Sequence, residues 1–190
     1  MRPISSRIRQ SLFDIIRPRI MGSRFLDLFA GTGTVGLEAL SRGASLVFFV
    51  DMDPRCVKVI ERNVERAGLK DRAKVHRANA LAPLTWVAYR AGIEQFDLIF
   101  LGPPYVDEQK RPLRYSQPML GNIAAANLLA PGGWIVSQHF KKEPLTAPAG
   151  YEIFRNARYG DTTLSFLRRL GEARPSFSSD PETEVGPDQP

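Results

Sequence analysis

Apolar and polar residues alternate in blocks along the chain and predict strands that alternate with helices. Buried parallel strands are short apolar runs, whereas amphipathic helices repeat apolar residues three or four positions apart. Strands are predicted at 25–29, 45–50, 73–77, 96–101 and 134–137, and helices at 6–16, 35–40, 54–68, 81–89 and 118–129. The runs 151–155 and 162–167 predict a closing antiparallel pair, with its turn at Tyr159-Gly160-Asp161. This order is typical of an α/β protein with a mostly parallel sheet.

The segment after the first strand gives the first indication of chemistry. Residues 24–36 read RFLDLFAGTGTVG, in which a strand, a glycine turn and the start of a helix follow one another. Such a turn brings backbone N–H groups to a ligand at the carboxyl end of a parallel sheet. The spacing Gly31-x-Gly33-x-x-Gly36, with Asp51 20 residues after Gly31, also fits a dinucleotide-binding site.

Asp27 favours a different cofactor. It lies inside the first apolar run, four residues before Gly31, and a buried carboxylate is costly unless it has a partner. We therefore predict that Asp27 faces a cationic or hydrogen-bonding ligand. A pyrophosphate would be repelled there, whereas the ammonium and sulfonium groups of S-adenosylmethionine would be attracted. S-adenosylmethionine is thus favoured over a nicotinamide dinucleotide.

The ends of the next two predicted strands add polar groups. Asp51 ends the second, where an acid can bind both hydroxyls of a ribose. Asp53 and Pro54 then begin a helix, as its cap and its first-turn residue. Asn79-Ala80 follows the third strand, and the Asn79 amide fits either the edge of an adenine or a simple helix cap.

The fourth predicted strand runs into Gly102-Pro103-Pro104-Tyr105. Two consecutive prolines hold the backbone extended and rigid, so the carbonyls of this turn keep their positions. Tyr105 offers a flat apolar face at the end of the sheet. These four residues are the predicted catalytic turn, and the polar residues 107–114 predict a loop over the site.

Composition narrows the class of protein. A chain of 190 residues with 43% hydrophobic and 24% charged residues fits one globular domain. The single cysteine, Cys56, excludes an intramolecular disulfide, and the two histidines have no neighbouring cysteines, so no metal-binding pattern appears. No signal peptide is visible, and no apolar stretch approaches the roughly 18 residues of a membrane span. We expect a cytoplasmic monomer without a metal or a membrane partner.

Charge indicates a polyanionic partner. Residues 171–190 are rich in proline, serine and acid, carry a net charge of −4 and predict a disordered tail, so residues 1–170 form the predicted domain and carry +10. Arginines gather around the first helix, at Arg2, Arg7, Arg9, Arg17, Arg19 and Arg24. Arg2, Arg7 and Arg9 are candidate contacts to phosphates, and a solvated helix face is an equal alternative for this segment.

Four segments together resemble class I S-adenosylmethionine-dependent methyltransferases: DLFAGTGTVGLEALSRGA, VDMD, the Pro-Pro-Tyr turn and YGDTTLSFLRR. Among these enzymes the chain is similar to the bacterial RsmD-like family, which methylates the exocyclic amine of a guanine in small-subunit ribosomal RNA. The resemblance covers residues 2–169 and includes the arginine-rich first helix. It implies a doubly wound, mostly parallel, Rossmann-like sheet of seven strands whose last strand is antiparallel. It also implies ribosomal RNA, or an assembling small ribosomal subunit, as the partner.

The resemblance assigns roles to the motifs. Pro103, Pro104 and Tyr105, with Gly102 ahead of them, are implied to hold the base. The residues expected to hold S-adenosylmethionine are Asp27, Phe29, Gly31, Thr32, Gly33, Asp51, Met52, Asn79 and Ala80.

Two features depart from the family pattern. The turn after the fourth strand normally begins with Asp or Asn, whose side chain accepts a hydrogen bond from the target amine, whereas this chain has Gly102. Losing one preorganised polar partner typically slows an enzyme about 10²–10³-fold, so the residues predict slow transfer, unless Asp107 or Glu108 folds back as a substitute. The family also usually carries a basic β-hairpin ahead of its Arg-Pro, and this sequence begins at Met1-Arg2-Pro3.

The leading hypothesis is therefore an RNA guanine amine methyltransferase. The alternatives are a cofactor-binding, RNA-associated protein without catalysis, an NAD-dependent oxidoreductase, and a methyltransferase for amines of DNA or of protein side chains. On this sequence, Gly102→Asn or Gly102→Asp is expected to raise methyl transfer by about an order of magnitude or more.

Overall fold

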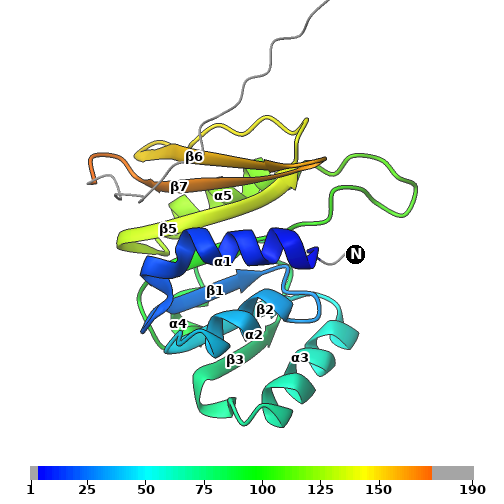
Figure 1. Cartoon of the computed structure of the whole chain (residues 1–190), viewed down its shortest axis with the longest axis vertical. Helices are drawn as coiled ribbons and strands as arrows, with labels where there is room; N and C mark the ends of the chain where they lie inside the picture. The colour runs from blue at the N-terminus through cyan, green and yellow to red at the C-terminus, as the bar shows by residue number, and fades with distance from the viewer. Residues whose placement is uncertain (1–3, 173–190) are drawn as a thin grey trace, which may run out of the picture.

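The computed structural model describes residues 4–172, which form one seven-stranded sheet covered by helices on both faces (Figure 1). The strand order is β3-β2-β1-β4-β5-β7-β6. Strands β1 to β5 run parallel, and β7 is antiparallel to both of its neighbours, β5 and β6. The predicted mostly parallel sheet with an antiparallel last strand is confirmed.

The strands are β1 (Arg24–Leu28), β2 (Leu46–Asp51), β3 (Ala73–Arg77), β4 (Phe96–Leu101), β5 (Leu129–Phe140), β6 (Tyr151–Tyr159) and β7 (Thr162–Arg169). The helices are α1 (Ser6–Ile20), α2 (Thr34–Ser41), α3 (Pro54–Arg66), α4 (Val87–Ala91) and α5 (Ser116–Ala125), with a short 3₁₀ turn at Lys70–Arg72. Ser5 and Asp53 cap α1 and α3 through their side chains. In the described part of the chain, no helix is long and apolar enough to cross a membrane.

Two cores follow from the two faces of the sheet. Because successive strand residues point to opposite faces, Phe25 packs with α1, α2 and α3, whereas Leu26 and Leu28 pack with α4 and α5. Figure 1 shows α1, α2 and α3 on the near face of the sheet. The doubly wound arrangement leaves the carboxyl ends of β1, β2 and β4 together at one edge.

The structure corrects the predicted boundaries around β5. The helix expected at 118–129 is α5, which begins earlier and ends at Ala125, and the strand expected at 134–137 extends from Leu129 to Phe140. Pro131, Gly132 and Gly133 lie inside this strand, although their residue types predict a turn. A register shift between Phe96 and Leu98 of β4 marks this irregularity. A Cβ on Gly133 would lie 2.9 Å from the carbonyl oxygens of Ala130 and Asp97, so close backbone approach requires glycine there.

Three further predicted boundaries of helices and strands were wrong. The strand expected at 151–155 is β6, which extends to Tyr159 and so includes the first residue of the turn predicted at Tyr159-Gly160-Asp161. Residues 81–86, expected in a helix with 87–89, form turns ahead of the short α4, and α1 continues to Ile20 with Pro18 inside its last turns. The tail predicted at 171–190 lies outside the described residues from 173 onward.

Candidate active site

The glycine turn leaves β1 with several residues in the left-handed region. Phe29, Gly31 and Gly33 have φ values of 60°, 57° and 78°. Gly33 is the N-cap of α2, and its N–H donates to the Ala30 carbonyl at 2.8 Å. A Cβ at Gly33 would lie 3.0 Å from Ile60, so both the conformation and the space favour glycine. The turn therefore exposes backbone at the amino end of α2.

Asp27 lies below this turn and is only 1% exposed. Its Oδ2 accepts a hydrogen bond from the Gly36 N–H at 2.9 Å. Since Gly33 offers no side chain, Asp27 supplies the cap that α2 otherwise lacks. Burial raises the pKa of Asp27 to about 7, the Gly36 hydrogen bond opposes the shift and the nearby Asp51 adds to it. The structure thus gives this carboxylate a backbone partner, and its contact with a cofactor stays a prediction.

Asp51 holds two loops together at the end of β2. Its Oδ2 accepts from the Gly31 N–H at 2.7 Å, and its Oδ1 accepts from the Asp53 N–H at 2.9 Å. The side chain is 3% exposed. One carboxylate therefore ties the glycine turn to the β2–α3 loop, at the position predicted to bind a ribose.

The remaining predicted cofactor residues surround this point. Met52 is 61% exposed, whereas Ala80 is buried. Phe29 stacks on Tyr115, with ring centroids 6.5 Å apart, and the Thr32 hydroxyl lies 3.0 Å from that of Thr34. Asn79 Oδ1 accepts from the Leu81 N–H within a turn. Because no helix begins there, Asn79 is not the helix cap that was one of its two predicted roles, and its contact with an adenine edge stays a prediction.

The Gly102–Tyr105 turn lies beside the glycine turn. Leu28 and Leu101 are partners in the β1–β4 register, and the Gly102 N–H donates to the Leu28 carbonyl at 3.3 Å. The hydroxyl of Tyr105 donates to Thr162 Oγ1 at 3.2 Å and accepts from Gln138 Nε2 at 2.9 Å. Burial raises the pKa of Tyr105, so its hydroxyl keeps its proton at neutral pH. The β7 and β5 strands thus fix the ring that is predicted to hold the base.

The polar loop after this turn closes on itself. Val106 and Pro112 form a bridge, and the Asp107 carboxylate accepts from the Arg111 N–H and its Nε at 2.8 and 2.6 Å. Arg111 thereby holds the pKa of Asp107 below its ordinary value. Asp107 is consequently engaged with its own loop and does not turn back toward Gly102.

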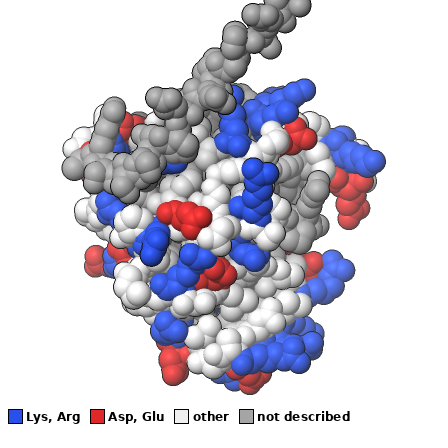
Figure 2. Space-filling model, in the orientation of Figure 1, with Lys and Arg blue, Asp and Glu red and all other residues white. Residues whose placement is uncertain are grey.

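A basic surface lies beside this edge. Figure 2 shows Lys and Arg side chains across the face on which α1 lies, with acidic side chains between them.

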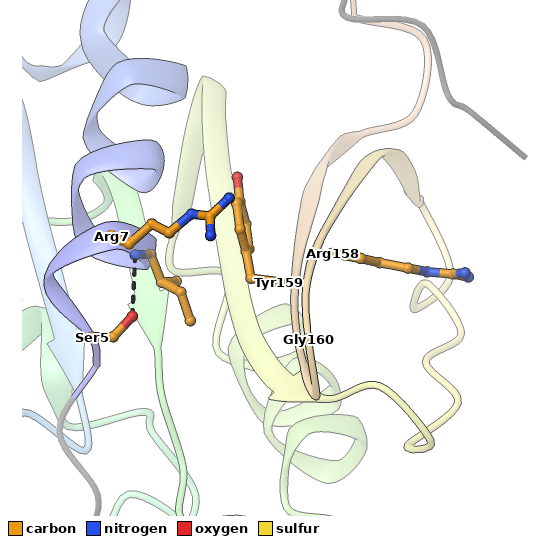
Figure 3. Close-up of a pocket in the computed structure, with 6 residues that line it drawn as sticks. Ser5, Arg7, Arg158, Tyr159 and Gly160 are labelled. Carbon is orange, nitrogen blue, oxygen red and sulfur yellow. Dashed lines mark hydrogen bonds between the residues drawn. The ribbon is translucent and has the colours of Figure 1, made fainter. Parts of the chain in front are cut away.

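A pocket of about 280 Å³ lies between the start of α1 and the β6–β7 turn, and it is lined by Ser5, Arg7, Ile8, Arg158, Tyr159 and Gly160. Figure 3 shows Arg7 projecting toward Tyr159, whereas Arg158 points away from α1. The hydroxyls of Tyr159 and Ser11 form a hydrogen bond, which holds the β6–β7 turn against α1. Arg9 lies on α1, and Arg2 lies outside the described residues.

Sequence reasoning missed Gln138 and Arg158. Gln138 directly follows the strand predicted at 134–137, and that carboxyl-end position is the signal that points to it. Within residues 4–172, no group of three His, Cys, Asp or Glu side chains is placed to hold a metal ion.

A family model and two relatives match nearly the whole chain. The family model described as conserved hypothetical protein 95 matches residues 1–168. The Bacillus subtilis protein YlbH, named provisionally as an rRNA methyltransferase, is 33% identical over 171 residues, which cover 90% of this chain and 89% of YlbH. The ribosomal RNA small subunit methyltransferase D of Escherichia coli is 29% identical, over 89% of this chain and 80% of its own.

A solved structure shares the fold. A hypothetical protein of Thermus thermophilus superposes with a TM-score of 0.68 at 35% identity, over 87% of this chain and 86% of that one.

Proposed function

The chain belongs to the conserved hypothetical protein 95 family, and from that premise we propose that it is an S-adenosylmethionine-dependent methyltransferase that acts on the exocyclic amine of a guanine in small-subunit ribosomal RNA. The names of the relatives support the reaction and the RNA substrate. We propose that residues 1–170 form the catalytic domain and that the protein works in the cytoplasm.

One observation carries the proposal: the two turns that the reaction needs leave the sheet from paired residues. The glycine turn follows Leu28 and the Pro-Pro-Tyr turn follows its register partner Leu101, with a hydrogen bond between the two segments. Methyl transfer depends mainly on placing the nucleophile in line with the bond to be broken. Adjacent donor and acceptor turns provide such proximity, which neither turn provides alone.

The residues at the glycine turn fit the cofactor. Asp51 is a buried acid at the end of β2, where an acid can bind ribose hydroxyls, and Asp27, whose pKa is raised to about 7, adds negative charge at the turn when it is ionised. Two carboxylates near one turn favour a cation over a pyrophosphate. S-adenosylmethionine, when bound, supplies an electrophilic methyl group on a sulfonium. Asp27, Gly31, Gly33 and Asp51 would hold it, with Phe29, Thr32, Met52, Asn79 and Ala80 around it.

The residues at the second turn fit a flipped base. The amine of guanine is a poor nucleophile because its lone pair is delocalised into the ring, so hydrogen-bond acceptors beside it assist the reaction. The carbonyl of Pro103, in the rigid turn, would be one such acceptor, and Tyr105 would provide the stacking face. The anchored hydroxyl keeps this face at the edge of the sheet.

Methylation of small-subunit ribosomal RNA from a strain that lacks this modification tests the function. We expect incorporation of the methyl group at N2 of a guanine, and thermal stabilisation of the protein by S-adenosylhomocysteine but not by NAD. Cofactor binding without transfer to RNA would favour the RNA-associated protein without catalysis. Stabilisation by NAD alone would favour the oxidoreductase.

Asp51→Ala is expected to weaken S-adenosylmethionine binding by about 1.5–3 kcal/mol, the range of hydrogen bonds to charged groups. The substitution removes the ribose acceptor and also the bond to Gly31. Isothermal titration calorimetry measures the effect. Asp53→Ala is the matched control, because Asp53 caps α3 and should lower stability without changing affinity. If Asp51→Ala and the unaltered chain bound S-adenosylmethionine with equal affinity, Asp51 would not be a cofactor-binding residue.

RNA affinity is expected to fall steeply with salt, and replacing Arg2, Arg7 and Arg9 by Ala should flatten that dependence. Each lost phosphate contact reduces the slope of log K against log salt by about 0.7–0.9. The slope is measured by fluorescence anisotropy at several salt concentrations. Lys70→Ala is the control, since Lys70 pairs with Glu65 at 2.6 Å and lies in the 3₁₀ turn that follows α3, not on α1. An unchanged slope in the triple variant would show that these arginines contact no phosphates and only form a solvated helix face.

A further inference from the structure

The space beside Gly102 is faced by an amide oxygen from the neighbouring strand. Leu101 pairs with Ser137 in the β4–β5 register, so Gln138 lies level with Gly102. A Cβ built on Gly102 would lie 3.9 Å from Gln138 Oε1. The oxygen of Gln138 therefore lies next to the space that an Asp or Asn side chain at position 102 would enter.

Hydrogen bonds fix the direction of this amide. Tyr105 has one hydroxyl proton and donates it to Thr162 Oγ1, so the phenol oxygen accepts from Gln138 Nε2. Because Gln138 Nε2 donates to the Tyr105 hydroxyl, the Oε1 atom of the same amide points away from Tyr105 and toward Gly102. Gln138 as a whole is 9% exposed, and within residues 4–172 no donor is recorded on its Oε1, which keeps access to solvent. A preoriented acceptor is thus available at the turn.

We propose that Gln138 is a catalytic residue whose side-chain carbonyl accepts the hydrogen bond from the target amine that Gly102 cannot accept. The inference rests on the proposed function and names the group that completes its site. In the reaction the amine nitrogen forms a bond to the methyl carbon as the carbon–sulfur bond breaks, and the nitrogen then loses one proton to water. Gln138 orients and polarises the N–H without taking the proton. Of the two acidic candidates in the adjacent loop, Asp107 is held by Arg111, and Glu108 is exposed to solvent.

Gln138→Met removes the acceptor while keeping the length of the side chain. We expect single-turnover methyl transfer to fall roughly 100-fold, as for loss of one preorganised hydrogen-bonding partner, with unchanged affinity for S-adenosylhomocysteine. Gln138→Glu keeps an acceptor and should stay within about tenfold of the unaltered chain. Gln138→Glu also lacks the amide N–H that donates to Tyr105, so it separates the acceptor from the anchoring of the ring.

Gly102→Asn tests whether the two positions serve the same purpose. The φ angle of Gly102 is not in the left-handed region, so the backbone tolerates Asn, although the Phe100 ring edge 3.0 Å from the new Cβ must shift slightly. We expect Gly102→Asn to change transfer by the unaltered chain less than about threefold and to restore most of the activity lost in Gln138→Met. Such non-additivity is the mark of two groups that share one role.

Three results would overturn the inference. The first is equal transfer by Gln138→Met and the unaltered chain. The second is a tenfold or greater gain from Gly102→Asn in the unaltered chain, as the sequence alone predicts, because Gly102 would then leave the amine without an acceptor. The third is a loss in Gln138→Glu as large as in Gln138→Met, which would mean that Gln138 acts only by holding Tyr105 through its amide N–H. An unaltered chain that binds cofactor but methylates no guanine would instead refute the proposed function, and the role of Gln138 with it.

Discussion

Replacing Asp27 by Asn is expected to remove a loss of folding stability that the unaltered chain shows as the pH rises from 4 to 8. Asp27 is buried and its pKa is raised to about 7. A carboxyl group with a raised pKa holds its proton more tightly when folded than when unfolded. The unaltered chain therefore loses stability as the pH rises from about 4, the unfolded pKa, to about 7, where the folded group ionises.

The size of this change in folding stability follows from the shift of the Asp27 pKa. A change of about three pKa units corresponds to about 4 kcal/mol, so the stability of Asp27→Asn relative to the unaltered chain should grow by about that amount from pH 4 to pH 8. Urea unfolding at each pH measures it. Any fixed cost of the Asn amide cancels in the comparison between pH values.

Asp161→Asn provides a control of opposite sign. Lys141 holds the pKa of the exposed Asp161 below its ordinary value, so the stabilisation from this pair is present above the unfolded pKa and is lost only as the pH falls below about 4. The stability difference between Asp161→Asn and the unaltered chain should therefore stay nearly constant up to pH 8 and shrink only in more acidic solution. Stability curves of Asp27→Asn and the unaltered chain that run parallel from pH 4 to pH 8 would show that Asp27 ionises normally.

The same variant tests the role of Asp27 in binding. If S-adenosylmethionine is held partly by the negative charge of Asp27, its affinity for the unaltered chain should rise as the pH increases through 7. In Asp27→Asn the affinity should be lower and should not change over this range. A charge that destabilises the folded chain above pH 7 while it strengthens ligand binding is typical of a functional site.

Gly36→Ala is expected to destabilise the protein by about 3 kcal/mol and to abolish cofactor binding. The new Cβ would overlap Phe49 Cε1 and lie 2.8 Å from Val47 Cγ1, and both of these side chains are fully buried on β2. Helix α2 has to move away from the sheet, and overpacking of this severity lies at or above the usual range of about 1–3 kcal/mol. The Asp27–Gly36 hydrogen bond and the glycine turn would move with it.

Gly121→Ala is the matched control for this substitution. Gly121 lies within α5, is exposed, and has no atom within 4 Å of the position of its Cβ. Alanine should therefore stabilise the helix by about 0.5–1 kcal/mol. Thermal unfolding and calorimetric titration with S-adenosylhomocysteine measure both variants. Normal stability in Gly36→Ala would show that α2 does not need the close approach to β2.

Strands and caps near the site were predictable because local patterns determine them. The run at 96–101 gives β4 with its observed bounds, and Asp53-Pro54 begins α3 as the cap and first-turn pattern requires. The course of β5 was not predictable from its residue types. Pro131, Gly132 and Gly133 favour a turn locally, yet the chain there pairs with β4, because the contacts that hold it come from another strand.

For Asp27, too, the sequence indicates one part of its role and the structure supplies the other. The sequence indicates that a carboxylate in an apolar run needs a partner, and the structure identifies the Gly36 N–H as one. That partner is nine residues away along the chain and becomes adjacent only when α2 packs on the sheet.

The sequence by itself determined the α/β class, the glycine turn, Asp51 at the end of β2 and the Pro-Pro-Tyr turn at the end of β4, because periodicity and turn chemistry act over a few neighbouring residues. It also showed that Gly102 has no side chain to offer. Only the tertiary structure decided which groups surround that glycine, because Gln138, Tyr105 and Thr162 lie on β5, the β4 turn and β7 and meet only in the assembled sheet. Side chains separated by dozens of residues are brought within hydrogen-bond distance by strand order and register, which no local pattern encodes.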